Sequence, residues 1–359
     1  MSKKVAIIGT VGIPARYGGF ETLADYITRY LSEQYELTVY CSSKDCDSKP
    51  ECYNGAQLRY VPLKANGVQS ILYDVISLLR AISYADTILI LGVSGCAVLP
   101  LFKFVSRKKF VVNIDGLEWK REKWSPFAKW FLRLSEKLAV GAADSVVTDN
   151  KVIQDYVLDK YAIQSTLIAY GGDQASKTDI TDTALLRYPF LRQKYAFTVC
   201  RIEPENNLRM ILEAVRQNLA ISLVIVGNWD TSEYGRELRT AYSTVEGIHL
   251  LDPIYDQCEL DQLRSNCQLY LHGHSAGGTN PSLVEAMSLG LPVYAFDIDY
   301  NRETTENAAH YFSSSAELAT MLKDFKESTI SDIGGQMAEI AARRYQWEIV
   351  AAQYAALLD

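Results

Sequence analysis

The sequence predicts an α/β chain made of two doubly wound parallel-sheet domains. Short β-branched runs alternate with helical patterns along almost the whole chain. The runs VAIIG (5–9), TILIL (87–91) and LVIVG (223–227) show no polar alternation, which is typical of parallel strands covered by helices on both faces. The strand–helix alternation occurs twice, on either side of a polar segment at 174–182. A length of 359 residues also suits two domains.

Each expected strand is a short run rich in β-branched or aromatic residues, and each expected helix has apolar residues at helical spacing. The strands are expected at 4–9, 36–41, 57–61, 86–91, 109–113, 144–148, 165–169, 195–200, 222–226, 247–250, 267–271 and 292–296. The helices are expected at about 19–33, 69–81, 126–140, 150–159, 206–217, 232–242, 256–265, 281–289, 315–325, 331–343 and 346–358. These elements divide the chain into domains at 1–173 and 174–345, followed by a C-terminal helix at 346–359.

Composition excludes several classes of protein. Apolar residues make up 48% and charged residues 22%, as in soluble globular proteins, and the net charge of −7 disfavours nucleic-acid binding. No signal-peptide pattern follows the first residues, which favours a cytoplasmic location. The longest uncharged stretch, 87–102, is broken by glycines and Pro100, so we expect a strand, a loop and a helix start there rather than a membrane span. The seven cysteines form no CxxC pair and are expected to be plain thiols, without a zinc site.

The loop after the first strand, 9–21, contains a glycine pair before a helix. It does not match GxGxxG, and the second strand ends without an acidic residue, so a nicotinamide dehydrogenase is disfavoured. Gly18 and Gly19 leave bare N–H groups at a helix start, where a phosphate or a sugar hydroxyl can bind. The alternative is a flexible turn in which Glu21 only complements the helix dipole.

The segment 272–287 follows the strand CQLYL and reads HGHSAGGTNPSLVEAM. Asn280 suits a helix N-cap and Pro281 suits the first helical position. Gly277 and Gly278 permit close approach of a ligand to the backbone, so this turn is an expected diphosphate site. Glu285, one turn into the helix, is placed to accept the hydroxyls of a ribose. The alternative is a capping box formed by Ser282 and Glu285.

Two further strand ends carry candidate residues. Arg201 follows the strand FTVC, and its guanidinium suits a diphosphate; a surface ion pair with Glu203 or Glu205 is the alternative. Asp115 follows the strand KFVV and opens a loop rich in Trp and charged residues. It can serve as an acid/base group or bind a sugar hydroxyl, or it can be a helix cap or turn residue.

These motifs resemble the family 4 retaining glycosyltransferases of the GT-B fold, and especially the bacterial polysaccharide rhamnosyltransferases. The shared stretches are GGFET in the first loop, NIDGLEWKREKW from Asn113, CRIEPENN from Cys200 and HGHSAGGTNPSLVEAM from His272. The resemblance covers residues 5 to about 350. It implies two Rossmann-like domains that face a central cleft, with the C-terminal helices packing back toward the N-terminal domain. The N-terminal domain would bind the acceptor and the C-terminal domain the nucleotide sugar.

The resemblance also implies residue roles. Asp115 and Arg201 would be catalytic. The acceptor would contact Arg16, Glu118, Trp119 and Arg121. The nucleotide sugar would contact Gly18, Gly19, Arg201, Asn206, His274, Gly277, Gly278, Thr279, Asn280, Ser282 and Glu285. The wider family usually has Lys in place of Asn206 and Glu in place of Gly277, which indicates an altered donor sugar pocket. His272 or His274 can compensate for the missing Glu, or both can be structural.

The resembling enzymes transfer L-rhamnose from dTDP-β-L-rhamnose, with retention and without a metal or other cofactor, to a lipid-diphosphate-linked saccharide. A UDP-hexose donor, a sugar-nucleotide epimerase on the same scaffold and an inactive scaffold subunit stay open. A metal-dependent GT-A enzyme is disfavoured by the doubled alternation, although two DxD strings occur, at 45–47 and 297–299.

Residues 103–137 carry ten basic and four acidic side chains with interleaved aromatics, which predicts peripheral attachment to the anionic inner face of the cytoplasmic membrane. The alternative is a solvated helix face with its Trp side chains in the core.

Overall fold

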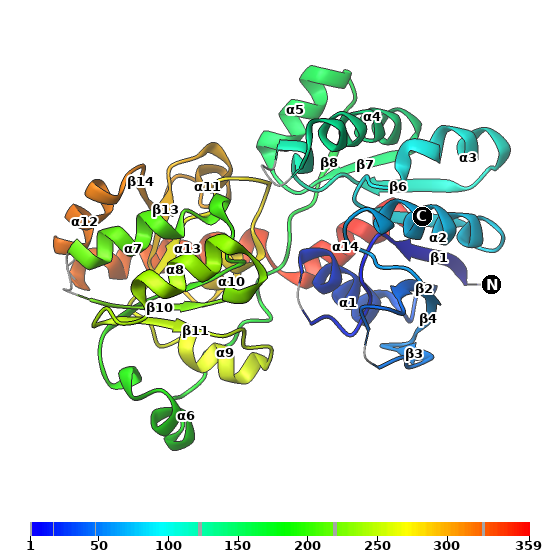
Figure 1. The fold of residues 1–359 in the computed structure, drawn as a ribbon. Coiled ribbons are helices and arrows are strands. Elements are labelled where there is room, and N and C mark those ends of the chain that lie inside the picture. The colour runs from blue at the N-terminus through cyan, green and yellow to red at the C-terminus, as the bar shows by residue number, and fades with distance from the viewer. Residues whose placement is uncertain (1, 17, 47, 121–123, 218–220, 325–326) are drawn as a thin grey trace. The chain divides into compact units, whose positions relative to one another are not determined.

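A computed structural model describes residues 2–16, 18–46, 48–120, 124–217, 221–324 and 327–359. The chain forms two compact units. Unit 1 comprises Met1–Tyr170 together with Trp347–Asp359, and unit 2 comprises Gly171–Gln346. Figure 1 shows both units as ribbons. The C-terminal helix therefore belongs to unit 1, while the chain from 171 to 346 builds unit 2.

Unit 1 contains an eight-stranded sheet in the order β3-β4-β2-β1-β5-β6-β7-β8. All neighbouring strands are parallel except β3 and β4. The strands are β1 (Lys3–Ile8), β2 (Tyr35–Ser42), β3 (Cys52–Tyr53), β4 (Ala56–Val61), β5 (Thr87–Leu91), β6 (Lys109–Asn113), β7 (Ser145–Thr148) and β8 (Thr166–Leu167). The helices are α1 (Gly19–Leu31), α2 (Gln69–Ile82), α3 (Leu99–Val105), α4 (Pro126–Ala142), α5 (Lys151–Tyr161) and α14 (Trp347–Leu358).

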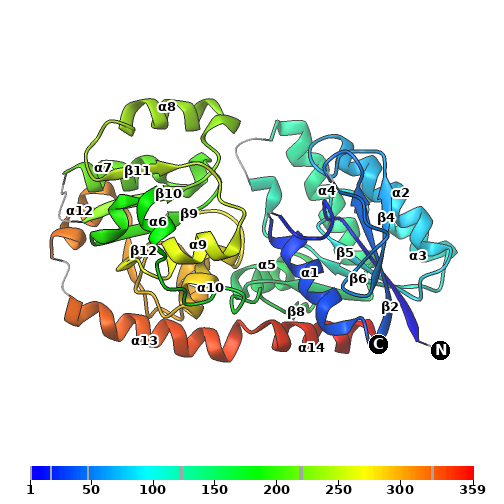
Figure 2. The same cartoon turned by 90° about the horizontal axis from the view of Figure 1, so that it is seen from below.

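The sheet of unit 1 is covered on both faces, as the apolar strands require. Helices α1 and α14 lie on one face and α2, α3 and α4 on the other (Figure 2). All five residues of β5 are buried, which agrees with a central parallel strand. The uncharged stretch 87–102 is β5, a loop and the start of α3, as the sequence predicts.

Helix α14 is fixed to unit 1 by specific contacts. The ring of Trp347 stacks on Tyr26 of α1 at a centroid distance of 4.5 Å. The Tyr354 hydroxyl accepts a hydrogen bond of 2.8 Å from the Asn113 amide at the end of β6. Thr87 Oγ1 donates to the Leu358 carbonyl at 3.0 Å. These bonds tie the last helix to the middle of the sheet rather than only to its surface.

Unit 2 contains a six-stranded parallel sheet in the order β11-β10-β9-β12-β13-β14. The strands are β9 (Tyr195–Val199), β10 (Ser222–Val226), β11 (Ile248–Leu251), β12 (Leu269–His272), β13 (Val293–Phe296) and β14 (His310–Phe312). The helices are α6 (Asp182–Arg187), α7 (Leu208–Gln217), α8 (Glu233–Tyr242), α9 (Gln257–Arg264), α10 (Pro281–Ser288), α11 (Asp299–Thr304), α12 (Ser315–Lys323) and α13 (Glu327–Arg344). Helices α7 and α8 cover one face, and α9, α10 and α13 cover the other (Figure 2).

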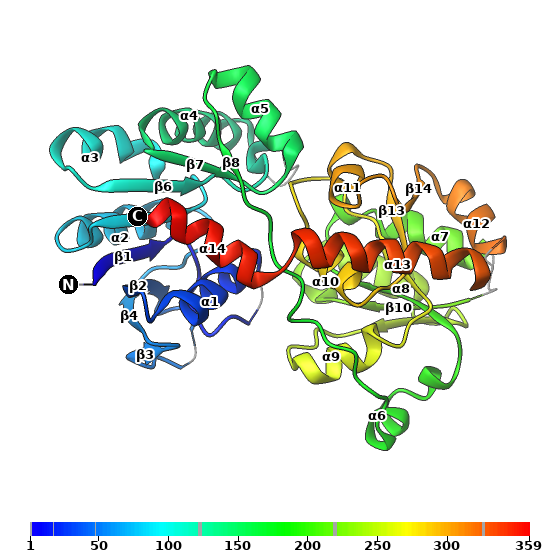
Figure 3. The same cartoon turned by 180° about the vertical axis from the view of Figure 1, so that it is seen from behind.

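Helix α13 runs alongside α10 (Figure 3). Two glycines permit this packing, because a Cβ at Gly334 would lie 2.4 Å from the Gly290 carbonyl oxygen. The α13 backbone therefore approaches the turn that ends α10 more closely than any other residue at 334 would allow. This close packing supports the helix that carries Glu285.

Helix starts follow their capping residues. Asn150, Ser232 and Asp256 each accept a hydrogen bond from a backbone N–H in the first turn of α5, α8 and α9, respectively. Sequence periodicity places α7 two residues too early, because Pro204–Asn206 forms a 3₁₀ turn and Asn207 adopts a left-handed conformation (φ 49°). Periodicity also misses the short elements β3, β14, α6 and α11, which are too short to show a period.

Candidate functional site

The carboxyl ends of β9 and β12 lie side by side in unit 2. The two strands are parallel neighbours, with Ala196 paired to Leu269 and Phe197 to Tyr270. Arg201 follows β9, and the glycine-rich loop follows β12. In doubly wound sheets, ligands bind at this edge. The register therefore brings together two motifs that are more than 70 residues apart in sequence.

Hydrogen bonds join the two loops directly. Asn207 Nδ2 donates to the Gly273 carbonyl at 2.8 Å, and the Ser275 N–H donates to the Glu205 carbonyl at 2.8 Å. A Cβ at Gly273 would lie 2.1 Å from the Asn206 carbonyl oxygen, so only glycine fits this approach. The glycine-rich loop is thus held in place by the segment after Arg201.

Asn206 lies at the centre of this junction. Its Nδ2 donates to the Arg201 carbonyl at 2.8 Å, and its Oδ1 lies 2.9 Å from Nδ1 of His274. The Asn206 side chain is buried. Asn206 and His274, two expected nucleotide contacts, therefore also bond to each other and position the backbone around Arg201. The Arg201 side chain itself is exposed.

Helix α10 begins as the sequence predicts. Asn280 is its N-cap and accepts a hydrogen bond of 3.0 Å from the Ser282 N–H, and Pro281 is its first residue. Gly277 has φ +99°, a conformation that favours glycine. Thr279 is buried beside this turn. The loop 277–280 therefore leads into a helix N-terminus, which carries the partial positive charge that suits an anion.

The capping-box interpretation of Ser282 and Glu285 is wrong. The Ser282 hydroxyl donates to Asn280 Oδ1 at 2.8 Å and accepts from the Tyr270 hydroxyl at 2.9 Å. Asn280 already caps the helix, and the Glu285 carboxylate bonds to other side chains. The physical reason is the position of the helix start, because Asn280 is the N-cap and Ser282 therefore lies inside the first turn, where it cannot act as the N-cap of a capping box.

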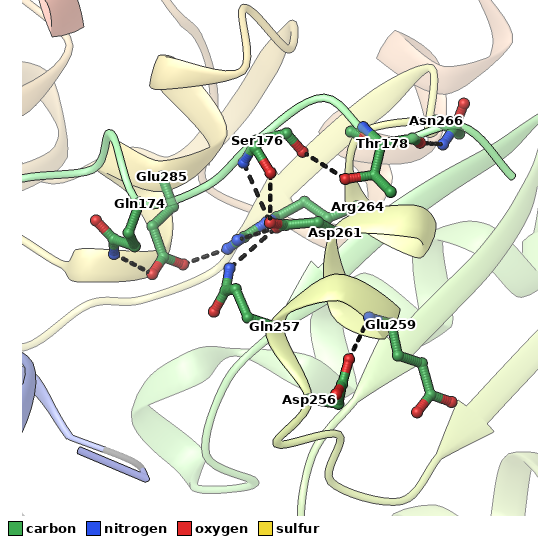
Figure 4. Close-up of polar contacts among 11 residues, drawn as sticks. Gln174, Ser176, Thr178, Asp256, Gln257, Glu259, Asp261, Arg264, Asn266 and Glu285 are labelled. Carbon is green, nitrogen blue, oxygen red and sulfur yellow. Dashed lines mark hydrogen bonds and ion pairs between the residues drawn. The ribbon is translucent and has the colours of Figure 1, made fainter. Parts of the chain in front are cut away.

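Glu285 belongs to a buried polar network (Figure 4). One carboxylate oxygen, Oε2, pairs with the guanidinium of Arg264 on α9, and the other, Oε1, accepts from the Gln174 amide at 2.5 Å. Arg264 also pairs with Asp261 at 2.7 Å. Burial by itself would lower the pKa of Arg264, but the charges of Glu285 and Asp261 outweigh it and raise the pKa. The guanidinium therefore stays charged.

The segment at the start of unit 2 passes close to α10. A Cβ at Gly172 would lie 2.3 Å from the Val284 carbonyl oxygen, and the Gly172 N–H donates to the Tyr345 carbonyl at 2.8 Å. Ser176 donates its N–H to Asp261 Oδ2 at 3.1 Å. These contacts explain why unit 2 begins at Gly171, three residues before the expected boundary at 174.

His272 is the buried residue at the end of β12. Burial and the neighbouring His274 lower the pKa of its imidazole to about 3, so the ring is neutral at pH 7. Within the described part of the chain, its Nε2 has no hydrogen-bond partner. A neutral imidazole with an unused ring nitrogen can donate or accept one hydrogen bond, depending on its tautomer.

Sequence reasoning missed Gln174, Asp261 and Arg264. Asp261 and Arg264 are three positions apart on α9, and both are almost completely buried. The i, i+3 spacing of opposite charges is the only signal in the sequence. That spacing is common on exposed helix faces, so burial is what distinguishes this pair.

In unit 1, Glu21 shapes the loop before α1. Its carboxylate accepts hydrogen bonds from the Val11 N–H at 2.7 Å and from Thr10 Oγ1 at 3.1 Å. A Cβ at Gly18, where φ is +126°, would lie 1.9 Å from Glu21 Oε2. Glu21 therefore does more than complement a dipole, because it fixes the loop. Arg16 of the same loop is exposed.

Tyr170 links two predicted segments of unit 1. A Cβ at Gly19 would lie 3.2 Å from its ring. Burial, with the charges of Asp115, Asp149 and Glu21, raises the pKa of Tyr170 well above its usual value. Asp115 has φ +61°, and its N–H bonds to Asn113 Oδ1 at 2.9 Å. Gly19 therefore packs on a buried phenol whose pKa also responds to the charge of Asp115, nearly 100 residues away in sequence.

The tryptophan-rich loop is fixed by carboxylates. Trp119 Nε1 donates to the buried Glu136 of α4 at 3.0 Å, and Trp124 Nε1 donates to Glu118 at 3.0 Å. The guanidinium of Arg133 lies 4.1 Å from the Trp119 ring centroid, a cation–π distance. Arg121, an expected acceptor contact, lies outside the described residues.

The first aspartate of each DxD string, Asp45 and Asp297, bonds to other groups of the protein. Arg302 bonds to both oxygens of Asp297, at 2.6 and 2.8 Å, and lowers the pKa of that carboxyl. Asp45 accepts from Ser42 Oγ at 2.8 Å and from the Ala65 N–H at 3.0 Å; Asp47 lies outside the described residues. Among the described residues, no group of three His, Cys, Asp or Glu side chains is close enough together to hold a metal ion. All seven cysteines are free thiols, as expected.

The aromatic residues of α4 are not in the core. Phe127 is 73% and Trp130 is 57% exposed, which contradicts the alternative of a core position for Trp130, whereas Trp119 and Trp124 are half-buried. None of the described helices is long and apolar enough to cross a membrane.

Comparison with known proteins identifies two domains. Residues 2–173 match a family model described as a domain of unknown function, DUF1972. Residues 189–331 match the family model described as Glycosyl transferases group 1. The GtfA subunit of UDP-N-acetylglucosamine–peptide N-acetylglucosaminyltransferase from Streptococcus pneumoniae is 24% identical over 178 residues. That alignment covers 47% of this chain and only 34% of the subunit.

Solved structures share the fold along the whole chain. Sucrose-phosphate synthase from Thermosynechococcus elongatus superposes with a TM-score of 0.82 at 15% identity, covering 99% of this chain and 98% of that one. HepE from Anabaena, in complex with UDP-glucose, gives a TM-score of 0.76 at 16% identity, covering 100% and 99%. Trehalose 6-phosphate synthase from Burkholderia multivorans gives 0.76 at 12% identity, covering 100% and 96%.

The fold is therefore GT-B, as the sequence predicts, and the GT-A alternative is wrong. Within unit 2, the segment that matches the glycosyltransferase group 1 model contains Arg201, the glycine-rich loop and Glu285.

Proposed function

We propose that this protein is a retaining glycosyltransferase that transfers L-rhamnose from dTDP-β-L-rhamnose to a lipid-diphosphate-linked saccharide. The observation that carries the proposal is the junction of the β9 and β12 loops. It brings Arg201 to the same sheet edge as the N-terminus of α10, in the segment that matches the glycosyltransferase group 1 model. A cation and a helix N-terminus together suit a diphosphate.

The proposed reaction needs no covalent intermediate. The bond between the sugar C1 and the diphosphate oxygen breaks, and the acceptor hydroxyl attacks C1 from the same face. The hydroxyl proton passes to the departing diphosphate. Arg201 and the backbone amides at 277–280 stabilise the charge that develops on the leaving group, which is the largest contribution expected for such a site. Glu285 accepts a sugar hydroxyl of the nucleoside.

Unit 1 would bind the acceptor. Gly19 packs on the Tyr170 ring, and the charge of Asp115 contributes to the raised pKa of that phenol. A carboxylate and a glycine pair suit a polyhydroxylated ligand. Asp115 would accept a hydrogen bond from the acceptor hydroxyl and orient it for attack. The reaction as written uses no metal ion or other cofactor.

The rhamnose donor is proposed from the motif resemblance, and the nucleotide sugar class is supported by the UDP and UDP-glucose complexes of HepE. The missing family Glu, replaced here by Gly277, would leave room at the sugar hydroxyls. The neutral, unpaired Nε2 of His272 would supply one hydrogen bond near this loop.

Attachment to a membrane surface in the cytoplasm is the second part of the proposal. Helices α3 and α4 pack together and expose large apolar side chains: Leu101 at 61%, Phe104 at 89%, Phe127 at 73% and Trp130 at 57%. Basic residues are interleaved with them in sequence. Exposed aromatics combined with basic residues favour an anionic lipid surface, where a lipid-linked acceptor also resides.

The decisive experiment supplies the protein with dTDP-β-L-rhamnose, UDP-glucose and UDP-N-acetylglucosamine in turn, with a lipid-diphosphate-linked saccharide as acceptor. We expect transfer from dTDP-rhamnose alone, in buffer with or without EDTA, and a β-linked product by NMR, because retention keeps the configuration of the β donor. Transfer from a UDP-sugar would replace the donor assignment. Epimerised nucleotide sugar, or no turnover with any donor, would favour the epimerase or the inactive scaffold.

A further inference from the structure

The carboxylate of Glu285 already has a donor on each oxygen. Arg264 reaches Oε2 from α9, and Gln174 Nε2 reaches Oε1 at 2.5 Å from the segment that begins unit 2 (Figure 4). Arg264 is completely buried. Since the guanidinium pairs with Asp261 as well, it is held on both sides and holds Glu285 in one orientation.

The number of hydroxyls that Glu285 can accept is limited by these two donors. An ionised carboxylate accepts only, with about four lone-pair sites over its two oxygens. A vicinal diol binds a carboxylate best when each hydroxyl faces a different oxygen. Here Gln174 takes one position on Oε1 and Arg264 takes one on Oε2, so a diol must share both oxygens with these donors, whereas a single hydroxyl shares only one oxygen.

The backbone that carries Gln174 is anchored. Gly172 packs against the Val284 carbonyl and bonds to Tyr345, and Ser176 bonds to Asp261 on the other side. With both flanks fixed, the Gln174 side chain has little room to withdraw from Glu285 without losing its hydrogen bond. The amide is therefore presented to Glu285 from an anchored backbone segment.

We propose that Gln174 is a specificity-determining residue, which makes the Glu285 site select a nucleotide with one ribose hydroxyl over one with a vicinal diol. The ligand class is a 2′-deoxyribonucleoside diphosphate and its sugar conjugates. The inference rests on the proposed nucleotide-sugar function and deepens it, because it gives a structural reason for a deoxythymidine donor rather than a uridine donor.

The test uses two ligands that differ only at the 2′ position, dTDP and 5-methyluridine diphosphate. Their dissociation constants are measured by calorimetry with the full chain. We expect dTDP to bind about fivefold to tenfold more tightly, as for one displaced hydrogen bond. In Gln174→Ala the preference disappears, because the ribonucleotide gains affinity. The matched control is Gln257→Ala, which removes an amide that bonds to Asp261 rather than to Glu285 and leaves the preference unchanged.

Equal affinities for both ligands in the natural protein, or a preference that survives Gln174→Ala, would overturn the inference and leave the proposed glycosyltransferase standing. The same loss of preference in Gln257→Ala would also overturn it, since the effect would then belong to the network as a whole. If neither nucleotide binds, the proposed function fails, and the inference fails with it.

Discussion

His274 Nδ1 lies 2.9 Å from Asn206 Oδ1, so the loop after β12 is hydrogen-bonded to the loop after β9 by two side chains. Asn206 is buried and uses its amide to support the Arg201 backbone. In the loop after β9, the proposed diphosphate site therefore depends on the guanidinium of Arg201.

Replacement of Arg201 tests that dependence. Arg201→Ala is expected to weaken dTDP binding by about 1.5–3 kcal/mol, the range for hydrogen bonds to a charged group. Isothermal titration calorimetry measures the change. The control is Arg209→Ala on α7, whose guanidinium pairs with the exposed Glu237 at 3.4 Å. Unchanged dTDP affinity in Arg201→Ala would remove the residue from the site.

Replacement of Glu285 is expected to affect both binding and stability. Glu285→Gln removes the charge that pairs with Arg264, while Asp261 keeps its contact with the guanidinium. We expect weaker nucleotide binding and a loss of roughly 1–3 kcal/mol in the free energy of unfolding. A denaturant titration beside a binding titration separates the two effects. Lower stability with normal affinity would show that Glu285 is only structural.

Asp115 is expected to affect turnover more than donor binding. Asn tolerates the left-handed conformation that Asp115 adopts, so Asp115→Asn keeps the loop and removes only the charge. The rate constant kcat should fall by about 10²-fold, as for a reacting group that is no longer held in position, with the dTDP affinity unchanged. Normal kcat in this variant would exclude Asp115 from the mechanism.

The exposed face of α3 and α4 predicts reversible membrane binding. Liposomes that contain anionic lipid should float with the protein at low salt and release it at high salt, because screening shortens the range of the attraction. Phe104→Ser combined with Trp130→Ser should abolish flotation. Leu186→Ser on α6, which replaces an equally exposed side chain in unit 2, is the matched control. Equal binding to neutral lipid, or no binding at low salt, would contradict the prediction.

The raised pKa of Asp74 predicts that the free energy of unfolding depends on pH. Burial raises the pKa of this carboxyl, on α2, from 3.8 to about 8. The folded state therefore holds the proton of Asp74 more tightly than the unfolded chain does. The contribution of this proton to the free energy of unfolding is complete below pH 4 and is lost as the pH rises through 8. Between these values the slope is about 1.4 kcal/mol per pH unit for this group alone. Asp74→Asn should flatten the dependence of the unfolding free energy between pH 4 and 8. An unchanged slope would contradict the prediction.

Sequence periodicity determined the two parallel sheets, the helix start at Asn280 and Pro281, and the position of Arg201 after β9. These features are local. A continuous apolar run specifies a covered parallel strand, and Asn followed by Pro specifies a helix N-terminus without reference to the rest of the chain. The glycine pair and the tryptophan-rich loop were visible for the same reason, because their residue types are unusual within a short window.

Only the tertiary structure decided what Glu285 contacts. Its partners Gln174 and Arg264 lie 111 and 21 residues away, and a charged pair at i, i+3 on α9 looks like any exposed helix face until burial is known. The same holds for Tyr170. Gly19 packs on its ring, and the charge of Asp115 contributes to the raised pKa of its hydroxyl. Burial turns ordinary polar residues into fixed ones, because a buried charge must be paired, and that pairing depends on which strands the fold places side by side.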